Sequence, residues 1–251
     1  MFHDVLKNIF FSRERSTSVI VLGMHRSGTS CLAGLLEESG VYLGNVSKKN
    51  PFNLKGNHEN ADIVSLNDSV LRYNNSNWHT PPLNNIKWND EHCDKRDDIL
   101  NNFKEVDCQC WGFKDPRVVF TLPFWLEEIK NPHFVGTFRH PLSVAQSIHA
   151  RNNQLSIEYG LQVWLKYNLS LLAFYKKKSF PLISFDVDGE EYLESIQGSL
   201  KYLGFSGEDE KSMTFFDEKL RHNKSIDLSY ELPSEVKDVY RQLISRYNNP
   251  T

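Results

Sequence analysis

The sequence predicts a three-layer α/β fold in which a central, mostly parallel β-sheet is flanked by helices. Three observations predict it. Short apolar runs typical of buried strands alternate with longer amphipathic segments typical of helices. The first apolar run, Val19–Leu22, leads through a glycine-bounded loop directly into an apolar helix. The 251 residues can bury a substantial core, and α/β proteins of this length are often one domain. We therefore expect a single domain over residues 1–251.

The elements of the first half follow from hydrophobic periodicity and from the positions of glycine. In order, we expect a strand at 19–22, a helix at 30–39 that ends at Gly40, a short strand at 41–43, a loop at 44–58 and a helix at 59–72. Residues 73–98 are rich in Asn and carry Trp78 and Trp88, which predicts an irregular cap. Before the first strand, apolar residues at helical spacing predict an amphipathic extension over residues 1–17.

The second half repeats the alternation of helix and strand. The expected elements are a helix at 97–106, a strand at 110–114, a helix at 118–130, a strand at 134–138, helices at 142–151 and 156–177, a strand at 181–185, and helices at 190–203 and 231–247. Such an alternation is what a parallel sheet covered on both faces requires.

The loop after the first strand has the features of a phosphate cradle. Gly23 and Gly28 permit tight backbone turns, and the N–H groups of residues 27–30 are expected to point toward an anion at the helix N-terminus. The spacing of the two glycines is that of a nucleoside-triphosphate P-loop. Thr29, however, stands where such a loop carries its lysine, and the cation has moved to Arg26. The loop therefore argues against ATP as the ligand.

The segment His25-Arg26-Ser27-Gly28-Thr29-Ser30 resembles the 5′-phosphosulfate loop of the PAPS-dependent sulfotransferases, in the form used by a bacterial branch. PAPS is 3′-phosphoadenosine 5′-phosphosulfate. The resemblance implies an Arg at the end of a central strand and a Ser eight residues later, and Arg139 and Ser147 stand at that separation. A third match is the segment 111–117, which contains the Lys-Asp-Pro-Arg sequence of the same branch.

The resemblance implies a three-layer P-loop fold, PAPS as the donor and no metal. The residues that it implies for donor binding are His25, Arg26, Ser27, Gly28, Thr29, Ser30, Arg139 and Ser147. Two departures from the family pattern remain. The C-terminal Arg-Lys-Gly segment that closes over the 3′-phosphate is absent, and we expect the basic segment 220–224, with Arg221, to replace it; the alternative is an ordinary basic loop. Phe185-Asp186 stands where many members have Tyr-Glu, so no tyrosine hydroxyl is expected to contact adenine at this position.

Sulfuryl transfer places negative charge on the leaving nucleotide, so cations and positioning do most of the catalysis. We expect three catalytic residues: Arg26 to neutralise the leaving 5′-phosphate, Lys114 to contact the transferred sulfonyl group, and Glu59, in a Gly-x-x-Glu segment like that of the bacterial branch, to act as general base. Lys114 and Glu59 have alternatives. Lys114 would form an ion pair with Asp115 or another neighbour. Glu59 would only cap a helix, and His58 or His25 would then be the base. Arg117 is expected to be structural.

Composition and targeting signals limit the partners. The net charge of −3 gives no basic field, so nucleic acid is not an expected partner. No transmembrane segment and no signal peptide are expected, and four cysteines without a metal pattern indicate a reducing compartment, so the predicted location is cytoplasmic.

The predicted reaction moves a sulfuryl group from PAPS to a hydroxyl acceptor, a carbohydrate or other small metabolite. The alternatives are a P-loop nucleotide or sugar kinase, or a non-catalytic nucleotide-binding protein. The oligomeric state is not predicted.

Overall fold

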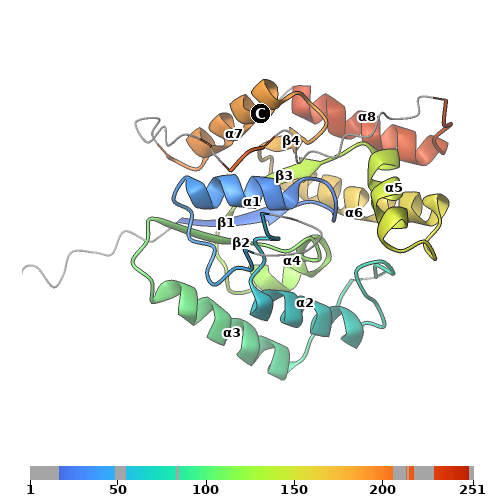
Figure 1. The fold of residues 1–251 in the computed structure, drawn as a ribbon. Helices are drawn as coiled ribbons and strands as arrows, with labels where there is room; N and C mark the ends of the chain where they lie inside the picture. Colours follow the sequence, from blue (N-terminus) through green and yellow to red (C-terminus); the bar gives the residue numbers. More distant parts are fainter. Residues whose placement is uncertain are drawn as a thin grey trace, which may run out of the picture.

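A four-stranded parallel sheet forms the centre of the computed structural model, which describes residues 17–48, 55–82, 85–205, 213, 215–217 and 229–248. The strands are β1 (Thr17–Leu22), β2 (Cys110–Lys114), β3 (His133–Phe138) and β4 (Leu182–Ser184), and their order is β2-β1-β3-β4. Each adjacent pair is parallel, with Ile20 opposite Phe113 on one side and Phe134 on the other. The predicted α/β P-loop fold is thereby confirmed (Figure 1).

Helices cover both faces of this sheet because alternate strand residues point to opposite sides. Val19 and Val21 of β1 belong to one apolar cluster, which includes residues of α1 (Thr29–Glu38) and α7 (Gly189–Tyr202). Ile20 and Leu22 belong to a larger cluster on the other face. That cluster takes residues from α2 (Ala61–Tyr73), α3 (Asp90–Lys104), α4 (Val118–Leu126), α5 (Pro141–Arg151), α6 (Ile157–Lys177) and α8 (Ser234–Asn248).

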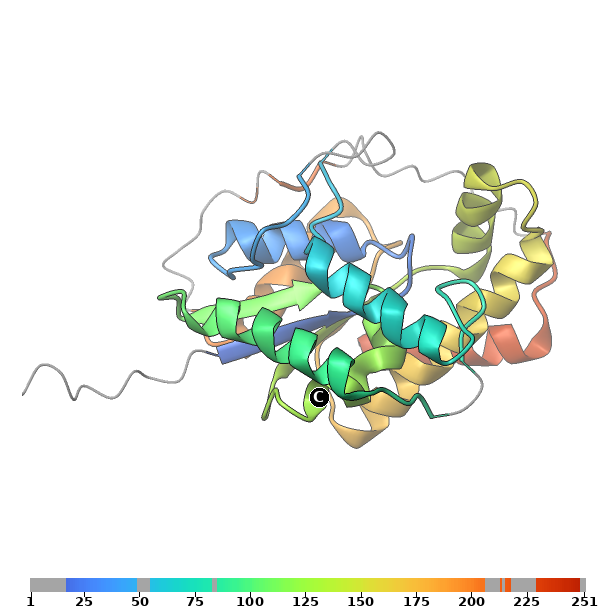
Figure 2. The ribbon, with the colours of Figure 1, turned by 90° about the horizontal axis from the view of Figure 1, so that it is seen from below.

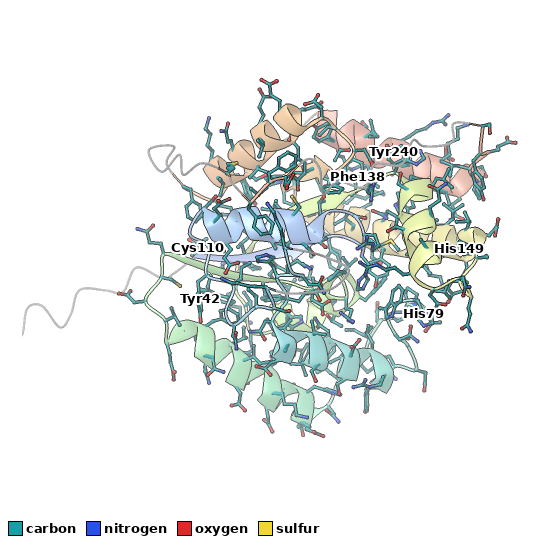
Figure 3. All side chains as sticks on the ribbon, viewed as in Figure 1. Tyr42, His79, Cys110, Phe138, His149 and Tyr240 are labelled. Carbon is teal, nitrogen blue, oxygen red and sulfur yellow. The ribbon has the colours of Figure 1, made fainter. Side chains whose placement is uncertain are left out.

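The carboxyl ends of the four strands meet at one edge of the sheet, as parallel pairing requires. In Figure 2 the strand arrows run toward the side of the molecule on which α5 lies. Figure 3 shows Cys110, at the start of β2, far from Phe138, at the end of β3. The ring of Phe138 lies 6.2 Å from that of Tyr240 in α8. Ligands of open α/β sheets bind at this carboxyl edge, so the candidate site is sought there.

Several expected boundaries are wrong, and local capping explains two of them. The helix expected at 118–130 ends at Leu126, and the helix expected at 231–247 begins at Ser234. The helix expected at 97–106 begins at Asp90, because Asn89 and His92 form a capping box, so the expected irregular cap of residues 73–98 is helical from Asp90 onward. The helix expected from Glu59 begins at Ala61, because Asn60 is its N-cap. In place of a strand at 41–43 there is an isolated bridge between Tyr42 and Trp111.

Two expected segments lie outside the described residues. The extension predicted over 1–17 is described only at Thr17, the first residue of β1, and the basic segment 220–224, with Arg221, is not described at all. Among the helices that are described, none has the length and apolar character needed to cross a membrane.

Candidate functional site at the carboxyl ends of the strands

The loop between β1 and α1 needs glycine at two positions. Gly28 has a φ of +85°, and a Cβ atom there would lie 2.2 Å from the ring of Phe185. Gly23 has a φ of +153°, and its Cβ would lie 2.5 Å from the carbonyl oxygen of Thr137. Because glycine alone accepts such backbone angles and such close neighbours, the loop can fold tightly over the ends of β1 and β3.

Arg26 extends from this loop toward α5. Its backbone has a φ of +68°, which is uncommon for a residue with a side chain. Its Nε donates a 2.8 Å hydrogen bond to Oγ of Ser147. Burial, together with the positive charges of Arg151 and Arg139, lowers the pKa of Arg26 to about 10.

No carboxylate forms an ion pair with Arg26 within the described parts of the chain. A buried cation without a counter-charge is costly in a protein. Arg139 and Arg151 raise that cost, because their positive charges act on the same guanidinium. This part of the site is therefore electrostatically suited to an anion.

The N-terminus of α1 adds backbone donors to the same place. Gly28 is its N-cap, and no side chain caps the helix. The N–H groups of Gly28, Thr29 and Ser30 donate to no backbone carbonyl in the described structure, as in the first turn of any helix. The N–H of Ser27, which was also expected to face an anion, instead donates a long 3.3 Å bond to the carbonyl of Met24. Three of the four predicted N–H donors thus remain available to a ligand.

The side chains of Ser27 and Thr29 point into the protein. Thr29 is buried, and its methyl group lies where a Cβ on Gly23 would approach to 2.9 Å. Ser27 is also buried, and its Oγ has no hydrogen-bond partner in the described structure. The carbonyl of Ser27 accepts a 2.9 Å bond from Oγ1 of Thr137, which ties the loop to β3.

Arg139 follows β3 directly and is buried. Its Nε lies 3.3 Å from Oδ1 of Asp186, and its carbonyl accepts a 3.0 Å bond from Nε1 of Trp164. The resemblance implies that Arg139 and Ser147 bind one phosphate, and in the structure Ser147 accepts a hydrogen bond from Arg26. The charges of Arg139 and Arg26 still interact, so the two predicted phosphate-binding groups belong to one electrostatic unit.

Lys114, Glu59 and Ser30 form a second group of side chains. Lys114 ends β2 and is 1% exposed. Its Nζ lies 2.7 Å from Oε1 of Glu59 and donates to Oγ of Ser30 at 3.2 Å. Burial lowers the pKa of Lys114, although Glu59 opposes that effect. Two of the three predicted catalytic residues, Lys114 and Glu59, therefore lie together beside the start of α1. The ion-pair alternative for Lys114 is also present, with Glu59 as the partner.

A buried polar network fixes the turn that follows Lys114. Oδ2 of Asp115 accepts a 2.8 Å bond from Asn67, and its Oδ1 accepts a 2.8 Å bond from Arg117. Arg117 also contacts Asp68 at 2.6 Å. Burial acts to lower the pKa of Arg117, but the carboxylates of Asp115 and Asp68 outweigh it and raise that pKa. These contacts fit the structural role expected of Arg117.

Charged residues of both groups act on His25. Its ring centroid is 5.1 Å from that of Trp78 and 5.9 Å from that of Tyr167. Its Nε2 is buried and has no hydrogen-bond partner in the described structure. Burial, then the positive charges of Arg117, Lys114, Arg26 and Arg151 in that order, lower the pKa of His25 well below its ordinary value. The imidazole is therefore held neutral.

The other candidate side chains lie elsewhere. Nδ1 of His58 is 2.7 Å from Oε2 of Glu37, and Nε2 of His58 is 2.9 Å from the carbonyl of Lys55, so both ring nitrogens are engaged. Trp88 packs on Phe124. Of the cap aromatics, Trp78 is the one that reaches His25, and the hydroxyl of Tyr167 donates to its carbonyl at 2.9 Å. Across the residues that the structure describes, no group of three or more His, Cys, Asp or Glu side chains is arranged to hold a metal ion.

Sequence reasoning missed two charged residues of the site. Arg151 affects the pKa of Arg26 and stands four residues after Ser147 in α5, so its helical spacing was a usable signal. Asp186 contacts Arg139, but only the pairing of β4 with β3 brings these residues together. That pairing joins positions 47 residues apart, which local periodicity cannot predict.

The structure resembles a solved sulfotransferase domain. That protein is the sulfotransferase domain of the Synechococcus PCC 7002 olefin synthase, with a TM-score of 0.60 and 13% sequence identity over 92% of this chain and 96% of that chain. No family model and no curated protein matches the sequence. At this identity the likeness establishes a shared fold, and it spans nearly the full length of both chains.

Proposed function

We propose that this protein is a sulfotransferase that moves a sulfuryl group from PAPS to a hydroxyl acceptor. The observation that carries the proposal is the environment of Arg26. It is a half-buried guanidinium without a carboxylate partner in the described structure, it lies beside the uncapped N-terminus of α1, and it bonds to Ser147. An anion bound at the N-terminus of α1 would supply the counter-charge that Arg26 lacks in the described structure. The fold, shared with a sulfotransferase domain, is consistent with this proposal.

The residues present fit a donor with two anionic ends. The loop residues His25 to Ser30 would hold the 5′-phosphosulfate, through the N–H groups of Gly28, Thr29 and Ser30 and through Arg26. Arg139 and Ser147 would hold the 3′-phosphate. The positive charges of Arg26, Arg139 and Arg151 interact in the free protein, and the negative charge of such a donor would relieve their mutual repulsion.

In the proposed reaction the acceptor oxygen forms a bond to sulfur while the bond from sulfur to the bridging oxygen of the donor breaks. Arg26 stabilises the negative charge that develops on the leaving 5′-phosphate. It cannot supply a proton, because an arginine stays protonated. Lys114, at the edge of the same loop, stabilises the transferred sulfonyl oxygens. Metal-free catalysis of this kind depends on positioning and charge.

The proton of the acceptor hydroxyl passes to Glu59 in this proposal. Glu59 is ion-paired with Lys114 at 2.7 Å, so the two residues act as a unit whose carboxylate is oriented by the ammonium group. His25 remains the alternative base, because its neutral ring has an unpartnered Nε2. His58 is a poor candidate, because both its ring nitrogens are engaged.

The acceptor is proposed to approach along the cap residue Trp78. Its indole is partly exposed and lies against His25, and an aromatic ring at this place can stack on a sugar. A carbohydrate or another small hydroxylated metabolite is therefore the proposed acceptor class. A cytoplasmic location remains a prediction from the cysteine pattern.

The position of Thr29 favours this proposal over a kinase. In a nucleoside-triphosphate P-loop, a lysine at this position reaches the β- and γ-phosphates. Here the side chain is a buried threonine that packs against Gly23. No cation extends from this position of the loop, so a triphosphate would lack its usual partner.

The proposal is tested by transfer of radiolabelled sulfate from PAPS to a panel of sugars and hydroxylated metabolites. We expect a labelled product with the wild-type chain, strongly reduced labelling with Arg26→Ala, and unchanged labelling with Arg72→Ala, a control on the surface of α2. Binding of adenosine 3′,5′-bisphosphate without labelling of any acceptor would favour a non-catalytic nucleotide-binding protein.

A further inference from the structure

Asp186 follows β4, and Arg139 follows β3, the strand with which β4 pairs. The N–H of Phe185 donates a 2.8 Å bond to the carbonyl of Phe138, which extends the pairing of β3 and β4 beyond Ser184. This places Asp186 beside the turn that follows β3. Its Oδ1 contacts Nε of Arg139 at 3.3 Å, and its Oδ2 accepts a 2.5 Å bond from the backbone N–H of His140. The carboxylate thus holds both the guanidinium and the backbone next to it.

Phe185, the preceding residue, touches both halves of the proposed donor site. Its ring fills the space beside Gly28, where a Cβ would come within 2.2 Å of it. The guanidinium carbon of Arg139 lies 5.5 Å from the centre of the same ring, within the range of a cation–π contact. Arg139 is therefore held from two directions, by an aromatic face and by a carboxylate.

We propose that Asp186 is a positioning residue that gives the site its preference for a nucleotide with a 3′-phosphate. This inference rests on the proposed function, in which Arg139 binds that phosphate. Orienting a guanidinium before the ligand arrives lowers the entropy cost of binding. A carboxylate near an anion site also repels the anion, so Asp186 favours binding only if the orientation of Arg139 outweighs that repulsion. In this proposal orientation dominates, because two hydrogen bonds and the aromatic contact hold Arg139 and the backbone next to it in place.

The test compares two nucleotides that differ only in the 3′-phosphate: adenosine 3′,5′-bisphosphate and 5′-AMP. Both are titrated calorimetrically into the full chain. Asp186→Asn can accept only one of the two hydrogen bonds, so we expect its affinity for the bisphosphate to fall about tenfold and its affinity for 5′-AMP to stay unchanged. Asp188→Asn is the matched control. It lies two residues further on, caps α7 through a 3.0 Å bond from the N–H of Glu191, and should change neither affinity.

Asp186→Glu separates positioning from charge. It keeps the negative charge but moves the carboxylate by one methylene group, so we expect a smaller, still selective loss of bisphosphate affinity. No change with Asp186→Glu, an equal loss of both nucleotides with Asp186→Asn, or tighter bisphosphate binding once the charge is removed would each overturn the inference. If the wild-type chain itself shows no preference for the bisphosphate over 5′-AMP, the proposed function fails, and the inference with it.

Thermal unfolding of each variant establishes whether it is folded. Should Asp186→Asn not fold, Asp186→Glu decides the question alone, because a role limited to charge compensation predicts wild-type selectivity for it.

Discussion

Nε of Arg26 donates a 2.8 Å hydrogen bond to Oγ of Ser147, which lies 121 residues further along the chain. This bond joins the loop after β1 to α5, the two segments in which we propose that the two anionic ends of the donor bind. A donor that contacts both residues would replace this bond with its own contacts. Because the two residues are proposed to bind different ends of the donor, we expect their substitutions to have different effects: on turnover for Arg26 and on donor affinity for Ser147.

Arg26→Ala should reduce turnover more than donor affinity. The proposed role of Arg26 is to stabilise charge that develops only in the transition state, and removing one such group typically costs about a hundredfold or more in kcat. Arg139→Ala should instead weaken binding of adenosine 3′,5′-bisphosphate and leave turnover at saturating donor nearly unchanged. Steady-state kinetics and calorimetry on both variants check this. Equal losses of affinity with turnover retained in both would show that the division of roles is wrong.

Ser147→Ala should selectively weaken binding of the 3′-phosphate. We expect about a tenfold loss of affinity for adenosine 3′,5′-bisphosphate and none for 5′-AMP, because one hydrogen-bond donor to the phosphate is removed. Ser143→Ala, one turn earlier in α5, is the matched control. If Ser147→Ala bound both nucleotides like the wild-type chain, Ser147 would only hold Arg26.

Glu59→Ala should destabilise the protein through Lys114. Lys114 is 1% exposed and Glu59 17% exposed on their side chains, so removing the carboxylate leaves a buried ammonium group without its partner. Loss of one partner of a buried pair costs about 3–5 kcal/mol, and we expect the lower end because Glu59 is partly exposed. Denaturant unfolding measures the change.

The double variant Glu59→Ala/Lys114→Met should recover much of that stability, because no unpaired charge remains. Lys95→Gln is the control: it breaks the exposed pair with Glu91 on α3 and should have no measurable effect. Additive losses in the double variant would mean that the two residues stabilise the fold independently.

The lowered pKa of His25 predicts that the folded protein loses stability in mild acid. Burial and the surrounding cations hold the folded-state pKa of His25 well below 6.5, while an unfolded chain has the ordinary value. As the pH falls below 6.5, the unfolded state takes up a proton that the folded state does not. The free energy of unfolding is therefore unaffected by this residue above pH 6.5 and decreases as the pH falls from there toward the folded-state pKa.

His25→Asn should reduce the pH dependence of the unfolding free energy between neutral pH and mild acid. Thermal or denaturant unfolding at a series of pH values measures that slope. His149→Asn, on the exposed end of α5, should leave the slope unchanged. The idea is wrong if wild-type and His25→Asn chains lose stability in parallel.

Much of the fold was predictable because its signals are local. Val19–Leu22 and the segment 110–114 are short apolar runs, and both are strands. Gly23 and Gly28 marked a loop that requires glycine for steric reasons, as their positive φ angles show. The start of α3 at Asp90 was missed because its first turns are charged and lack an apolar stripe. There the capping box of Asn89 and His92 sets the boundary.

The sequence identified several residues of the candidate site, but it did not predict which of these residues contact one another. The sequence pointed to Glu59 and Lys114 separately, but only the fold makes them an ion pair. The family resemblance implied that Arg139 and Ser147 hold one phosphate, but no local pattern predicted the bond from Arg26 to Ser147. Asp186 was noted only as a departure from a family pattern, and its contact with Arg139 depends on the pairing of β3 with β4. Local patterns identify chemistry-bearing residues, but tertiary pairing decides which of them meet.

The most direct measurement is a pair of calorimetric titrations of the wild-type chain, one with adenosine 3′,5′-bisphosphate and one with ATP and Mg²⁺. We expect saturable binding of the bisphosphate, because Arg26 has no carboxylate partner in the described structure and Arg139 adds a second positive charge. We expect much weaker binding of ATP, because a buried threonine, Thr29, stands where a triphosphate loop has its lysine. Tight binding of ATP with no binding of the bisphosphate would contradict the proposed sulfotransferase function.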